Sequence, residues 1–200
     1  MTRRLFIAAA LLTAALALAV GAAAAGPVTL RENDGFAVKN SHMLCSVQIS
    51  ESLVPGKKVV ACFVVTNPNA GPVPKTYGVL LGVNGEAVLA KAGKNGQITS
   101  VKKLGGKPGP SEGPLARKGK LFKVAVGSVL AVKNSAIRCG VTKQKFGTKK
   151  ATTVGCFKVG ANGKPRPNSF GIGLTDGGAF LVHFGADSKG TPVKIVQHGK

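Results

Sequence analysis

The pattern of apolar and polar residues after position 25 predicts β-strands along the whole chain. Short runs rich in Val, Leu and Ala alternate with polar residues and are separated by Gly, Pro and Asn, as in half-buried strands joined by turns. No segment there combines a helical period of 3.6 residues with capping residues. In the first half of the chain, the predicted strands are Phe36–Val38, Met43–Ile49, Lys58–Val65, Tyr77–Val83, Glu86–Ala90 and a last one near Ile98–Lys102.

The second half of the chain repeats this pattern. Val38-Lys39-Asn40-Ser41 recurs as Val132-Lys133-Asn134-Ser135, 94 positions later, and the two cysteines of each half keep the same offset. Agreement between cysteine spacing, apolar pattern and turns predicts a tandem duplication. We expect β units at 26–103 and 120–200, joined by a Gly/Pro-rich linker at 104–119 whose prolines exclude regular structure.

The predicted fold is therefore all-β, with two tandem homologous units of five or six short antiparallel strands. Each unit would be a small sandwich or barrel, and the two units are either separate or merged by packing across a pseudo-two-fold axis. Asn84-Gly85 is the best single turn signal, because a type I′ hairpin turn needs a positive φ at both central residues. Gly177-Gly178 satisfies the same requirement in the second unit.

The first 25 residues have the pattern of a secretory signal peptide. Arg3 and Arg4 precede an uncharged apolar run that ends in alanines, which predicts cleavage near Ala25-Gly26. An uncleaved membrane anchor is the alternative, since the run is long enough to span a bilayer. The arginine pair fits twin-arginine export and ordinary Sec export equally. Cleavage would leave a secreted or cell-envelope-associated protein.

The four cysteines all lie in the part of the chain that would be exported, which favours disulfides. A lone ancestral unit could pair only its own two cysteines, so the duplication predicts Cys45–Cys62 and Cys139–Cys156. Sixteen residues separate the members of each pair, whereas zinc sites and redox motifs use closer pairs such as C-x-x-C.

The net charge of +21 comes from 28 basic and 7 acidic residues, and it is unevenly distributed. Residues 120–200 alone carry 14 basic and 2 acidic side chains. This excess predicts attraction to polyanions, although a solvated lysine-rich surface would have the same composition. Lysine far outnumbers arginine, which argues against bidentate phosphate recognition. The candidate anion-binding residues are Lys143, Lys145, Lys149 and Lys150, inside the predicted Cys139–Cys156 loop, and Lys158 beyond it.

No catalytic or metal-binding set is visible in the sequence. His42, His183 and His198 lack metal-ligand spacing, the seven acidic residues form no acid/base pair, and no nucleophile elbow or phosphate-binding loop is present. We therefore expect no catalytic residue, no metal and no cofactor. Sequence-specific nucleic-acid binding is not expected either, because the chain has no recognition helix and few stacking aromatics.

One arrangement resembles a group of known domains. Asn-Ser-x-x-x-Cys, a second cysteine in a Val-rich strand, then Tyr/Phe-Gly-hydrophobic and a glycine turn resemble small secreted bacterial cysteine-bearing β domains of unassigned function. The likeness covers about 45 residues of each unit. It implies export and a β-rich unit, and it brings no catalytic residues.

These features predict a secreted, non-enzymatic binding or structural protein of the cell envelope or extracellular space. Its expected partners are an anionic cell-wall polymer, an acidic polysaccharide or an anionic lipid surface; the sequence does not fix the oligomeric state. The alternative is an extracellular hydrolase or inhibitor with a site in the cleft between the units, where His183 would lie near Asp176 or Asp187.

Overall fold

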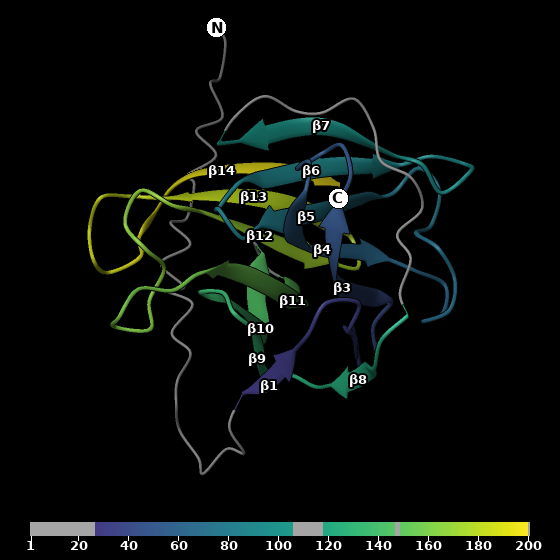
Figure 1. Ribbon diagram of the computed structural model, residues 1–200, viewed down its shortest axis with the longest axis horizontal. Coiled ribbons are helices and arrows are strands. Elements are labelled where there is room, and N and C mark those ends of the chain that lie inside the picture. The colour runs from purple at the N-terminus through teal and green to yellow at the C-terminus, as the bar shows by residue number, and fades with distance from the viewer. Residues whose placement is uncertain (1–26, 106–117, 147–148, 200) are drawn as a thin grey trace, which may run out of the picture.

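The computed structural model describes residues 27–105, 118–146 and 149–199, and in these residues it contains strands and no helix (Figure 1). The prediction of an all-β protein is confirmed. The expected signal peptide and most of the expected linker lie outside the described residues. Within them, no helix has the length and hydrophobicity of a membrane span.

In the described residues, fourteen strands form two mixed sheets of seven strands each. From edge to edge, the first sheet contains β7 (Ile98–Leu104), β6 (Ala87–Ala92), β5 (Tyr77–Gly82), β4 (Lys57–Val64), β3 (Met43–Ser50), β2 (Gly35–Val38) and β8 (Leu121–Val124). The second sheet contains β14 (Pro192–Gly199), β13 (Gly178–Phe184), β12 (Phe170–Thr175), β11 (Lys149–Lys158), β10 (Ile137–Phe146), β9 (Val129–Val132) and β1 (Val28–Leu30).

Each sheet takes one edge strand from the other half of the chain. β1 runs parallel to β9, with Val28 opposite Leu130, and β8 runs parallel to β2, with Gly35 opposite Leu121. The sequence predicted five or six antiparallel strands per unit, and the structure differs in number and in these two pairings. The cause is a pair of connections, 31–34 and 125–128, each of which carries the chain from one sheet to the other instead of forming a hairpin.

The main hydrophobic core lies between the two sheets, where β5 and β6 pack against β12 and β13. Both disulfides lie in this core, Cys45–Cys62 between β3 and β4 and Cys139–Cys156 between β10 and β11. Each joins residues that are directly opposite in the sheet, with Cα atoms 4.0 and 4.1 Å apart. These are the two pairs that the sequence predicts.

The recurring Val-Lys-Asn-Ser motif forms the same turn in both halves. Asn40 and Asn134 have φ values of 57° and 56°, a left-handed conformation that Asn tolerates better than most residues. The serine that follows each Asn accepts a hydrogen bond on Oγ from the backbone N–H two residues later, at Met43 and at Ile137. The motif therefore recurs because it ends a strand and starts the next one in the same way.

The turn at Asn84-Gly85 forms where the sequence predicts, but not as type I′. Of the two residues, only Gly85 has a positive φ, of 101°. The loop between β5 and β6 has four residues instead of two, and the Gly85 N–H donates to the Gly82 carbonyl at 2.8 Å. This loop needs one left-handed residue, at the glycine.

Candidate functional site

The β10–β11 hairpin presents three lysines on one face. Lys145 lies directly opposite Lys150, and Lys143 is two residues from Lys145, so all three side chains leave the same side of the hairpin. All three are exposed. Directly opposite side chains have Cβ atoms about 5 Å apart, and those two residues apart along a strand are about 7 Å apart. We call Lys143, Lys145 and Lys150 the lysine face.

The lysine face continues the buried face of the same strands. Residues two apart share a face, and going back along β10 from Lys143 the next residues on this face are Val141 and Cys139, both in the core between the sheets. The hairpin thus extends past the end of the core, where the inner face changes from apolar to cationic. No Asp or Glu occurs between Glu112 and Asp176, so no carboxylate in this stretch of chain offsets these charges.

Of the other two candidate lysines, the structure separates Lys158 from this face. Lys158 lies at the far end of β11, opposite Ile137, and eight residues of strand place it about 26 Å from Lys150. Its side chain lies beside the Gly85 turn of the first sheet. Lys149 pairs through its backbone with Phe146, and the side chain of Lys149 lies outside the described residues.

The histidines and carboxylates considered for catalysis do not converge. His183 stacks against Phe170, with ring centroids 4.9 Å apart. Asp176 lies in the turn at the opposite end of the β12–β13 hairpin, where its Oδ1 accepts hydrogen bonds from the Ser41 hydroxyl at 2.8 Å and the His42 backbone N–H at 2.9 Å. Among the described residues, no three His, Cys, Asp or Glu side chains are grouped to hold a metal ion.

Asp187 is held in its own loop. The Thr191 hydroxyl donates to its carboxylate at 2.6 Å, and the Thr191 backbone N–H donates at 3.1 Å. These bonds, the side-chain bond first, lower the pKa of Asp187 because they favour the ionised form. A carboxylate that is kept ionised by its own loop is an anchor for that loop and is not suited to act as a general acid near neutral pH.

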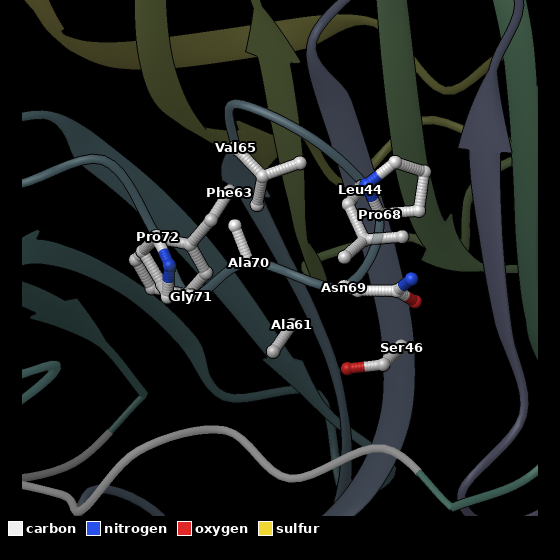
Figure 2. A pocket seen from close by; sticks show the side chains of 10 residues that line it. All are labelled: Leu44, Ser46, Ala61, Phe63, Val65, Pro68, Asn69, Ala70, Gly71 and Pro72. Atoms are coloured by element: carbon white, nitrogen blue, oxygen red, sulfur yellow. The ribbon is translucent and has the colours of Figure 1, made fainter.

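Figure 2 shows a cavity of about 310 Å³ on the outer face of β3 and β4, beneath the loop that follows β4. Its polar side chains are Ser46 and Asn69, and no ionisable side chain lines it. The sequence analysis missed this cavity, although the prolines at 68, 72 and 74 mark a rigid loop there. The lining residues are Leu44, Ser46, Ala61, Phe63, Val65, Pro68, Asn69, Ala70, Gly71 and Pro72.

Comparisons of the chain with protein-family models, with curated proteins and with solved structures find no match. The lysine face is therefore interpreted from its geometry alone.

Proposed function

We propose that this is a secreted or cell-envelope-associated, non-enzymatic binding protein that holds anionic polymers on the lysine face. One observation carries the proposal: Lys145 and Lys150 lie directly opposite each other, with Lys143 beside them. Like charges in directly opposite positions destabilise a sheet. A polyanion bound across the hairpin would relieve this repulsion, which supports a binding role for the arrangement.

Further features support the other parts of the proposal. Two buried disulfides are consistent with an oxidising compartment, and the signal-like sequence at 1–25 supports export. The shared strand order of the two sheets supports an origin by tandem duplication. Within such a pair, the lysine face would be a specialisation of the second copy.

The test is salt-dependent retention of residues 26–200 on immobilised heparin and on polyphosphate. Replacing Lys143, Lys145 and Lys150 by Glu should move elution to much lower salt, since three favourable charges become unfavourable. The matched control replaces three other exposed lysines, Lys39, Lys94 and Lys123, by Glu and gives the same net charge. Equal losses in the two triple variants would show attraction to net charge alone and would contradict the proposal.

A further inference from the structure

The outer faces of the two sheets are covered differently. In the first sheet, the connection between β3 and β4 folds back over the sheet and buries Leu53 and Val54 against Val59, Leu80 and Val88. Hydrogen bonds fix this connection, with the Val54 N–H donating to Ser50 Oγ at 2.7 Å. The chain thus covers the outer face of its first sheet with its own aliphatic side chains.

The second sheet has a groove at the corresponding place. Counted from the disulfide-bonded cysteines of β4 and β11, Val59 corresponds to Thr153, and the strand pairings make Val88 correspond to Phe180. Here β10 and β11 continue into a hairpin instead of folding back. Thr153 and Phe180 therefore line an open groove of about 40 Å³. The other lining residues are Gln144, Gly155, Cys156, Phe157, Gly171, Ile172, Val182, Phe184, Pro192 and Ile195.

The groove combines an apolar surface with one unpaired polar group. Three aromatic residues, two glycines and several aliphatic residues line it; the Phe180 ring lies close to Gly173, where an added Cβ would come within 2.0 Å of the ring. Thr153 is 1% exposed, and its hydroxyl has no hydrogen-bond partner among the described residues. A buried hydroxyl without a partner costs free energy, and this oxygen has almost no exposed surface of its own.

Two arginines lie near one end of the groove. Arg138 lies directly opposite Phe157, which lines the groove, and Arg166 donates from Nε to the Val159 carbonyl just beyond Phe157. At the other end of the same strands, the hairpin carries the lysine face on its opposite side. Two copies of a chain with this charge would repel each other, which disfavours self-association through this surface.

We propose that this groove binds an acidic segment of a partner protein that bends as residues 51–56 do, with two adjacent aliphatic side chains packed over the groove. The chain itself shows the chemistry, because Glu51-Ser52-Leu53-Val54 combines a carboxylate with the two aliphatic residues that cover the first sheet. The arginines would meet the carboxylates of the segment. This site is separate from the lysine face and does not depend on the proposed function.

The probe is a fluorescein-labelled peptide with the sequence of residues 49–56, Ile-Ser-Glu-Ser-Leu-Val-Pro-Gly. We expect saturable binding to residues 26–200, measured by fluorescence anisotropy, and much weaker binding of a peptide with Ser in place of Leu and Val. In NMR spectra, the largest amide shifts should fall at Thr153, Gly155, Phe180 and Ile195. Equal binding of the two peptides, no saturable binding, or shifts centred on the lysine face would overturn the proposal.

A matched pair of variants tests the site in the protein. Ile195 lines the groove on edge strand β14 and is 45% exposed, whereas Val101 lies on edge strand β7 of the first sheet and is 43% exposed. Ile195→Ser should weaken peptide binding about tenfold, as expected when one aliphatic contact is lost, and Val101→Ser should leave it unchanged. Heparin retention should be the same in both variants, which separates this test from that of the lysine face. Equal effects of the two substitutions on peptide binding would also contradict the proposal.

Discussion

At the scale of single residues, Asp34 shows how one buried carboxylate connects the two halves of the chain. Its side chain is 7% exposed and lies where the chain crosses from the second sheet to the first. Oδ2 accepts from the Arg31 backbone N–H at 2.8 Å, and Oδ1 accepts from the Lys120 backbone N–H at 2.9 Å. The carboxylate thus fixes both the β1–β2 connection and the start of β8.

Replacing this carboxylate should be costly. Asp34→Ala leaves two backbone N–H groups without their acceptor, so the free energy of unfolding should fall by about 3 kcal/mol. Asp34→Asn keeps one acceptor oxygen and should lose less. The measurement is the urea midpoint of each variant, with Glu32→Ala as the control because Glu32 is exposed in the same connection. Similar midpoints for Asp34→Ala and Glu32→Ala would show that these bonds contribute little.

At the scale of elements, each disulfide fixes the pairing of one hairpin near its open end, away from the turn. The bonds join β3 to β4 and β10 to β11, and both cysteines of each pair are buried between the sheets. Each closes a loop across a sequence separation of 17. Loss of either bond should therefore loosen the hairpin and widen the denatured ensemble at the same time.

The two disulfides should contribute about equally. Replacing either pair, Cys45 with Cys62 or Cys139 with Cys156, by alanines should lower the free energy of unfolding by about 3 kcal/mol in the chain-entropy model. Mass spectrometry of the untreated protein should show no free thiol, and urea unfolding gives the change in stability. A double variant as stable as the parent protein would show that the bond adds nothing to the hairpin.

Sequence reasoning located the charge of the β10–β11 hairpin but not its geometry. The cluster of lysines is visible in the sequence, whereas the face of each lysine depends on the register between two strands. Alternation along a strand puts the side chains of neighbouring residues on opposite sides, so nearness in sequence does not place two lysines on one face. Lys158 was grouped with the others because it is near in sequence, yet the register places it at the far end of β11. The groove was missed because β3–β4 and β10–β11 share a pattern while the connections between their strands differ.

At the scale of the whole molecule, the two halves are interlocked by exchange of their first strands. The alternation at Val28–Leu30 and Leu121–Val124 is compatible with strands, but it carries no information about which strand each one pairs with. A short apolar strand can pair, parallel or antiparallel, with any unpaired sheet edge if its apolar side chains then point toward the core. The parallel pairs β1–β9 and β2–β8 therefore became visible only in the structure.

Interlocking predicts that a cut between the halves leaves the protein assembled. A protease site inserted between positions 105 and 118 should yield two pieces that elute together from a size-exclusion column in native buffer. Each sheet would still contain strands from both pieces, so the hydrogen bonds between these strands and the shared core would keep the pieces together. The urea midpoint of the cut protein should then depend on concentration, as for a dimer, while that of the uncut protein does not. Separation of the pieces in native buffer would contradict this.

The exchanged strands also bear on how fast the chain can reach its native state. Val28 meets Leu130, 102 positions later, so neither sheet is complete until most of the chain has been made. Closing such long loops costs conformational entropy before the new contacts compensate for it, and proteins dominated by distant pairings fold slowly. A half-synthesised chain would expose the β2 edge, with its partner β8 still to come. We therefore expect folding to finish late in synthesis, when the second half of the chain supplies the strand that completes the first sheet.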